Sequence, residues 1–136
     1  MITAIDTSVI IDMTSGDTAF GAASRGAVLR CRAQGQIIAC EVVWAEVVAG
    51  VSDGVALDAM LVAAGLEFSA LERGTALTAG FAWRQYRQRG GRRERIVADF
   101  LIGAHAMVQA DRLLTRDRGF QRAYFPELTV LDPLGG

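Results

Sequence analysis

The sequence predicts an α/β fold with a central, mainly parallel sheet of four to five strands. Short apolar runs rich in Val, Ile and Leu alternate along the chain with longer segments of helical periodicity. Glycines follow several of the helical segments, where a helix commonly ends. Short strands that are separated by helices form βαβ units, and the strands of such units run parallel.

The expected elements follow from these runs and from their boundaries. We expect strands at residues 2–5, 36–39, 66–70, 113–115 and 129–131. We expect a first helix that begins near Ser8 and further helices at residues 20–34, 41–50, 55–64, 75–88, 95–110 and 119–124. The helix at 95–110 is almost wholly apolar, which indicates that it is buried.

Length and composition bound the architecture and the location of the protein. The 136 residues are expected to form one domain, residues 1–136, with a substantial core, because 51% of them are hydrophobic. No apolar run reaches the roughly 18 residues of a membrane span, and no basic segment precedes the first apolar residues as in a signal peptide. We therefore expect a cytoplasmic protein with no membrane partner. Cys31 and Cys40 lack metal-ligand spacing and are expected to be small buried side chains.

Four acidic residues stand alone in apolar stretches of the chain. They are Asp6, Glu46, Asp99 and Asp117. Burial of a carboxylate is unfavourable unless its charge is compensated. Asp6 and Asp117 fall just past expected strands, and Glu46 lies in a helix that follows another, so these positions converge on the sheet edge where ligands bind. We infer that the four acids meet and share a divalent cation.

The chemistry of the donor atoms points to one class of metal and reaction. Carboxylate oxygens favour Mg²⁺ or Mn²⁺, whereas one His and two scattered Cys cannot build a zinc site. Such an ion binds phosphate and activates water, so we expect metal-assisted hydrolysis of a phosphodiester. Ser8 and Thr115 are placed to hydrogen-bond a carboxylate or a bound water. The alternative for any one acid is a helix cap or a core residue satisfied by backbone amides.

Four short motifs, in this order, resemble those of a known family. They are Ile5-Asp6-Thr7-Ser8, Ala45-Glu46, Asp99-Phe100-Leu101-Ile102-Gly103-Ala104 and Leu114-Thr115-Arg116-Asp117-Arg118-Gly119-Phe120. The set resembles PIN-domain ribonucleases, and specifically the VapC toxins of type II toxin–antitoxin pairs, over the whole chain. This sequence departs from the pattern at Ser8, where many relatives carry Asn, and at Cys40, where a Ser or Thr helix cap is common.

The resemblance implies a fold, an activity and partners. The fold would be a three-layer α/β/α sandwich, and the activity would be that of a Mg²⁺- or Mn²⁺-dependent endoribonuclease that cuts translation-related RNA. Asp6, Glu46, Asp99 and Asp117 would form the acidic site, with Asp6 and Asp99 as direct metal ligands. Proteins of this kind form homodimers and are held inactive by a cognate antitoxin protein.

The basic residues are all arginines, and they are unevenly distributed. The net charge of −1 argues against general affinity for nucleic acids, yet six arginines fall within residues 84–95. We expect RNA contacts from the residues nearest two of the acids, namely Arg92, Arg93, Arg95 and Arg116. The alternatives for the cluster are a solvated helix end and a surface that faces an acidic segment of an antitoxin.

Other polar side chains receive a structural interpretation. His105 lies six residues after Asp99 and points away from it on a helix, so we expect a core or interface histidine. Asp12 is expected to be a surface charge or a cap.

Two rival functions are kept open. A haloacid-dehalogenase-type phosphatase or a receiver domain also places an Asp after its first strand, but both usually need a lysine late in the chain, and this chain has none. The other rival is a catalytically inactive PIN-like module that binds RNA or protein. Missing acids would favour it, and none of the four is missing.

Overall fold

A five-stranded parallel sheet forms the centre of the molecule. The structure, a computed structural model, describes residues 1–91 and 97–135. The strands are β1 (Ile2–Ile5), β2 (Gln36–Ala39), β3 (Leu66–Phe68), β4 (Arg112–Leu114) and β5 (Thr129–Leu131). They lie in the order β3-β2-β1-β4-β5, and every pairing is parallel. The prediction of an α/β fold with a parallel sheet is confirmed.

The central strand β1 is covered on both faces. Ala4 pairs with Ile38 of β2 on one side and with Leu113 of β4 on the other. These side chains, and Ile5 beside them, are buried. Side chains that are buried on both faces of a parallel sheet read as continuous apolar runs, which is why the strands could be recognised in the sequence.

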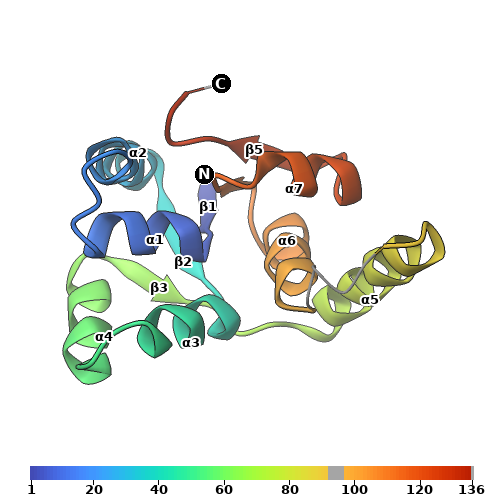
Figure 1. The fold of residues 1–136 in the computed structure, drawn as a ribbon, viewed down its shortest axis with the longest axis horizontal. Helices are drawn as coiled ribbons and strands as arrows, with labels where there is room; N and C mark the ends of the chain where they lie inside the picture. The colour runs from blue at the N-terminus through green and yellow to red at the C-terminus, as the bar shows by residue number, and fades with distance from the viewer. Residues whose placement is uncertain (92–96, 136) are drawn as a thin grey trace.

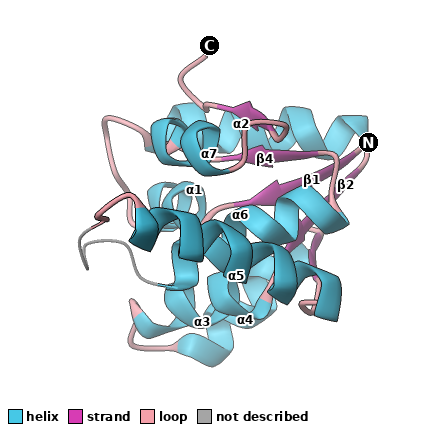
Figure 2. Cartoon of the chain, turned by 90° about the vertical axis from the view of Figure 1, so that its right-hand side faces the viewer, coloured by secondary structure: helices cyan, strands magenta, loops and turns pink. Residues whose placement is uncertain are grey.

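Within residues 1–91 and 97–135, seven helices connect and cover the strands. They are α1 (Thr7–Thr14), α2 (Gly21–Gln34), α3 (Glu41–Ala49), α4 (Gly54–Ala63), α5 (Arg73–Gln88), α6 (Val97–Gln109) and α7 (Arg118–Tyr124). Parallel strands are joined by right-handed crossovers, so connections that proceed toward β3 and toward β5 lie on opposite faces of the sheet. Helices α1 to α4 accordingly cover one face, and α5 to α7 cover the other (Figure 1). Figure 2 looks onto the second of these layers, and the predicted three-layer sandwich is confirmed.

Several boundaries differ from the sequence-based expectation. The strand expected at 66–70 ends at Phe68, and the amide of Ser69 makes the last hydrogen bond to β2, to Ala39 O at 2.9 Å. The helix expected to begin at 55 begins one residue earlier, because the side chain of Asp53 caps it by accepting from Ala56 N. Residues 95 and 96 of the expected helix at 95–110 lie outside the described part of the chain.

Helix α6 is the most deeply buried helix of the second layer, and aromatic rings fix its position. The ring of Phe100, which is fully buried, makes edge contacts with Tyr86 of α5 and with Phe120 and Tyr124 of α7. These contacts hold the first turn of α6, and therefore Asp99, against the neighbouring helices. None of the helices within residues 1–91 and 97–135 is long and apolar enough to cross a bilayer.

Candidate active site

The candidate site lies where the direction of the strand connections reverses. Strands β1 and β4 are neighbours, but the chain leaves β1 toward β2 and leaves β4 toward β5. The two connections therefore diverge at the carboxyl ends of these strands, the place where ligands bind in open parallel sheets. Asp6 follows β1 directly and Thr115 follows β4 directly, and Asp6 N donates to Leu114 O at 3.0 Å. The backbone thus brings the first and the last of the four motifs together.

Asp6 is held by three hydrogen-bond donors. Its Oδ1 accepts from Thr7 N at 2.7 Å, because Asp6 is the N-cap of α1. Its Oδ2 accepts from Thr115 Oγ1 at 2.5 Å and from Ser8 Oγ at 3.3 Å. Ser8 and Thr115 are the two hydroxyl side chains that we expected to support a carboxylate. Asp6 is thereby fixed in one orientation at the carboxyl end of β1.

Asp117 is tied to Asp6 through a single buried hydroxyl. Asp117 N donates to Thr115 Oγ1 at 2.9 Å, and the same oxygen donates to Asp6. Desolvation raises the pKa of the Asp6 carboxyl above its ordinary value, and the negative charge of Asp117 raises it further. The hydrogen bonds from Thr115, Thr7 and Ser8 oppose this rise. The fold therefore brings two like charges together, an arrangement that a cation would stabilise.

Glu46 is connected to the same place through a residue that the sequence analysis did not single out. The carboxylate of Glu46, in α3, accepts from Thr7 Oγ1 at 2.7 Å. Thr7 therefore connects the two acids, since its backbone amide caps Asp6 and its side chain holds Glu46. Its position directly after Asp6 was the available signal, but the 39 residues between Thr7 and Glu46 hid the contact.

Asp99 lies in the first turn of α6 and is half-buried. Helix α6 ends at the amino edge of the sheet, where Asp111 N donates to Ile2 O, so its first turn lies toward the carboxyl edge. Within residues 1–91 and 97–135, no three His, Cys, Asp or Glu side chains stand close enough together to form a ready ligand set for a metal. The structure thus joins Asp6 and Asp117 through Thr115, joins Glu46 to them through Thr7, and directs Asp99 to the same edge.

The donor set nevertheless suits a hard cation. Every acid of the four presents carboxylate oxygens, which are the ligands that Mg²⁺ and Mn²⁺ prefer. Burial and the negative charge of Asp117 both raise the pKa of Asp6, and a cation would oppose both effects. Cys31 and Cys40 are both free and buried, as expected.

The arginine cluster is only partly described. Arg92, Arg93 and Arg95, which we expected to contact RNA, lie outside the described residues. In the preceding helix the guanidinium of Arg87 lies over the ring of Trp83 at 5.9 Å. The remaining members, Arg84 and Arg89, are exposed.

Arg116 and Asp12 form a salt bridge that the sequence did not suggest. Nε and Nη2 of Arg116 donate to the two carboxylate oxygens of Asp12, at 2.7 and 3.0 Å. Asp12 is only 2% exposed, so its assignment as a surface charge or cap was wrong. The reason is that α2 packs over α1 and covers the face that carries Val9 and Asp12, three residues apart. Ser24 of α2 donates to the same carboxylate at 3.0 Å.

His105 is a core residue, as expected. It is 2% exposed, and its Nε2 lies 3.0 Å from Ser69 Oγ. Desolvation lowers the pKa of His105, and the charge of Glu41 partly offsets this shift.

Comparison with known proteins identifies the family. The model of the PIN domain family matches residues 3–126 of this chain. The chain belongs to the PIN domain family. A comparison of this sequence with curated proteins found no match.

Solved structures agree with this PIN fold. VapBC2 from Rickettsia felis, bound to a DNA fragment from its promoter, matches with a TM-score of 0.75 and 19% identity over 97% of this chain and 98% of the other. VapBC-1 from nontypeable Haemophilus influenzae gives 0.72 and 19% over 98% and 99% of the two chains. The sarcin-ricin loop cleaving toxin VapC20 of Mycobacterium tuberculosis gives 0.63 and 18% over 93% and 98%.

Proposed function

We propose that this PIN domain is a metal-dependent endoribonuclease that hydrolyses phosphodiester bonds in RNA. The observation that carries the proposal is the junction of Asp6 and Asp117 through Thr115 at the switch point of the sheet. Two like charges at a ligand-binding edge are better explained by a cation site than by a structural role. Asp99 and Glu46 supply the further carboxylates.

Each side chain has a distinct role in this proposal. Asp6 and Asp99 hold a Mg²⁺ or Mn²⁺ ion, and Glu46 and Asp117 complete the acidic site. When bound, the ion supplies a Lewis acid that lowers the pKa of water and offsets the charge that develops on the phosphate. Thr115 keeps the carboxylates of Asp6 and Asp117 in a fixed relation.

We further propose that the protein is the toxin of a toxin–antitoxin pair. Similarity over nearly the full length of both chains to VapC proteins, several of them solved with their antitoxins, supports this role. The similar fold of a toxin that cleaves the sarcin-ricin loop supports RNA as the substrate. The protein would then act in the cytoplasm as a homodimer and be neutralised by a cognate antitoxin.

RNA cleavage by the purified protein tests the enzymatic proposal. Wild type is incubated with end-labelled ribosomal and transfer RNA in Mn²⁺, in Mg²⁺ and in EDTA, and the new ends are mapped. We expect cleavage with either ion and none in EDTA or with Asp6→Asn. Asp53→Asn is the matched control, because it removes an exposed carboxylate and Asn is an equally good N-cap.

The same assay separates the rival binding module from the enzyme. RNA binding without divalent-dependent cleavage of any RNA would favour an inactive PIN-like module. Hydrolysis of a small phosphate monoester with no cut RNA would favour a phosphatase.

A further inference from the structure

The salt bridge between Asp12 and Arg116 connects the first helix layer to the candidate site. Asp12 is in the middle of α1, and Arg116 is in the short loop between β4 and α7, 104 residues away. The contact is bidentate, which fixes the plane of the guanidinium as well as its distance. The Asp12 side chain is 3% exposed and that of Arg116 is 33% exposed.

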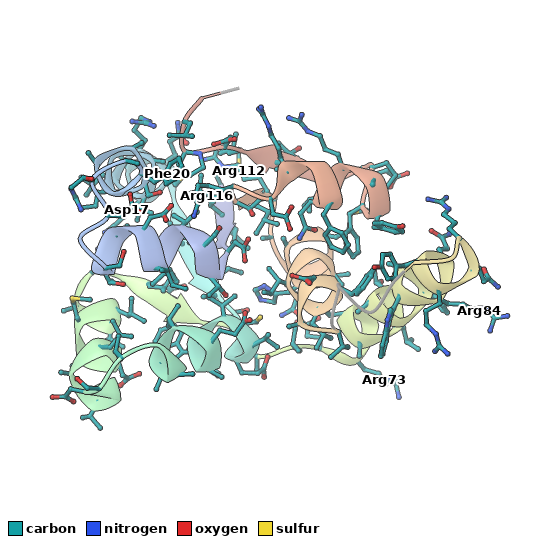
Figure 3. The ribbon with its side chains drawn as sticks, in the orientation of Figure 1. Asp17, Phe20, Arg73, Arg84, Arg112 and Arg116 are labelled. Atoms are coloured by element: carbon teal, nitrogen blue, oxygen red, sulfur yellow. The ribbon has the colours of Figure 1, made fainter. Side chains whose placement is uncertain are left out.

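A second contact, with an aromatic ring, holds the same guanidinium. It lies over the ring of Phe20, 4.3 Å from the ring centre. Phe20 is itself fixed, because its backbone amide donates to Asp17 Oδ1 at 2.8 Å. Figure 3 shows Arg116 beside Phe20 and Asp17, far from Arg84 at the other end of the molecule.

Breaking the contact between Arg116 and Asp12 is therefore energetically costly. If its guanidinium turned to an RNA phosphate, Asp12 would remain as a buried carboxylate, and its one remaining hydrogen-bond donor among the described residues would be the hydroxyl of Ser24. The RNA contact that we expected of Arg116 from the sequence would carry this cost. The geometry assigns to it a role inside the protein.

The loop that Arg116 anchors carries two members of the candidate site. Its neighbours in sequence are Thr115, which donates to Asp6, and Asp117, whose amide donates to Thr115. We propose that Asp12 is a positioning residue, which holds Arg116 and thereby keeps Thr115 and Asp117 in register with Asp6. The proposal rests on the function proposed above.

Three variants test the proposal: Asp12→Asn, Arg116→Gln and the double variant. Asp132→Asn is the matched control, because Asp132 pairs at 3.6 Å with Arg118, the first residue of α7 directly after the same loop, in a more exposed position. The double variant removes both charges together and so leaves no unpaired ion if a single variant fails to fold.

Steady-state cleavage of RNA is the first measurement. We expect both single variants to lower kcat by about 10–100-fold, as for residues that orient metal ligands, while KM changes little. We expect the double variant to be no worse than the singles, since the two residues act as one unit. The control is expected to keep wild-type kcat. If the singles keep wild-type kcat and KM, the positioning role is wrong.

Salt dependence distinguishes positioning from phosphate binding. An arginine that neutralises a phosphate contributes about one unit to the slope of log affinity against log salt concentration. We expect Arg116→Gln to leave this slope unchanged. A flatter slope and a higher KM in Arg116→Gln, with Asp12→Asn at wild-type activity, would overturn the proposal and make Arg116 an RNA ligand.

Amide hydrogen exchange tests the geometry independently of cleavage. We expect exchange at Asp117 N–H to be at least about tenfold faster in Asp12→Asn than in wild type, relative to the amides of β1, because local opening frees this amide. Asp132→Asn is expected to leave it unchanged. Unchanged exchange in Asp12→Asn contradicts the positioning. If wild type cleaves no RNA, the proposed function fails, while this measurement still decides whether Asp12 holds the loop.

Discussion

Two polar clusters follow the strands of the sheet, and they balance their charges in opposite ways. Asp6 and Asp117 follow β1 and β4, and their like charges add to the penalty that burial places on Asp6. His105 and Ser69 meet after β3, and the negative charge of Glu41 partly offsets the penalty that burial places on a charged His105. A cation would therefore stabilise the first cluster, whereas in the second the neighbouring charge partly opposes the effect of burial.

The sign of the neighbouring charges distinguishes a functional cluster from a structural one better than burial does. Both clusters contain partly or fully buried titratable groups with perturbed pKa values, a property shared by active sites and structural networks. Only the cluster at the β1–β4 switch point places charges of one sign together. Changes there should alter activity, and changes in the second cluster should alter stability.

Asp6→Asn is expected to give the largest effect and to change activity and stability in opposite directions. If Asp6 binds the metal as proposed, its loss should lower kcat for RNA cleavage by at least about 10³-fold. Because the folded-state pKa of Asp6 is raised above 3.8, the folded state binds the proton more tightly than the unfolded state. Wild type should therefore lose stability relative to the variant as pH rises from about 3.8 through the raised pKa.

Urea unfolding in EDTA between pH 3.5 and 8 measures this second effect. The variant should be the more stable protein at neutral pH, and the difference should shrink as pH falls. Excess Mn²⁺ should stabilise wild type, by about 2.7 kcal/mol at 100 times its Kd, and leave the variant unchanged. A variant less stable than wild type at neutral pH without metal would place Asp6 among structural residues.

Gln109→Ala should lower the stability of the protein without loss of activity, because Gln109 lies on the same side of the molecule as the second cluster. The side chain of Gln109 makes three hydrogen bonds to the segment that enters α5, with Glu72 N, Thr75 Oγ1 and Ala70 O. Their loss should lower the free energy of unfolding by about 2–3 kcal/mol, at roughly 1 kcal/mol each. Denaturant unfolding checks this, with the exposed Gln88→Ala as control. A large fall in kcat for folded Gln109→Ala would contradict the assignment of the second cluster to stability alone.

How much the sequence could predict depended on whether a feature was local. The strand at 129–131 and the placement of Asp6 after β1 were predictable, because apolar runs and strand ends are local patterns. The pair Asp12–Arg116 was not, since it depends on how α2 covers α1 and on where the β4–α7 loop docks. Asp12, an acid on the apolar helix α1, was not recognised as unusual, because its partner Arg116 lies 104 residues away along the chain.

Thr7→Val should produce an intermediate loss of activity. It removes the hydroxyl that donates to Glu46 but keeps the backbone amide that caps Asp6. With Glu46 no longer oriented, kcat should fall by about tenfold, at the lower end for residues that orient metal ligands. Thr7→Ser keeps the hydroxyl and should restore most of the activity. Equal losses in the Val and Ser variants would show that the methyl group, and not the hydrogen bond, matters.

The smallest effect, a pH dependence of stability set by His105, gives the sharpest contrast with Asp6. His105 is the only histidine of the chain, and its folded-state pKa is lowered below 6.5. Between that lowered pKa and 6.5 the unfolded state binds more protons, so stability should fall as pH falls, by at most about 1.4 kcal/mol per pH unit. His105→Gln should lose this dependence, measured by urea unfolding between pH 5 and 8.

Glu41→Gln should extend the pH dependence to lower pH, because Glu41 raises the pKa of His105. Because Glu41 already supplies a negative charge beside His105, Mn²⁺ should leave the His105-dependent slope unchanged while it removes the Asp6-dependent one. A slope at His105 that responds to metal would mean that the two clusters are coupled.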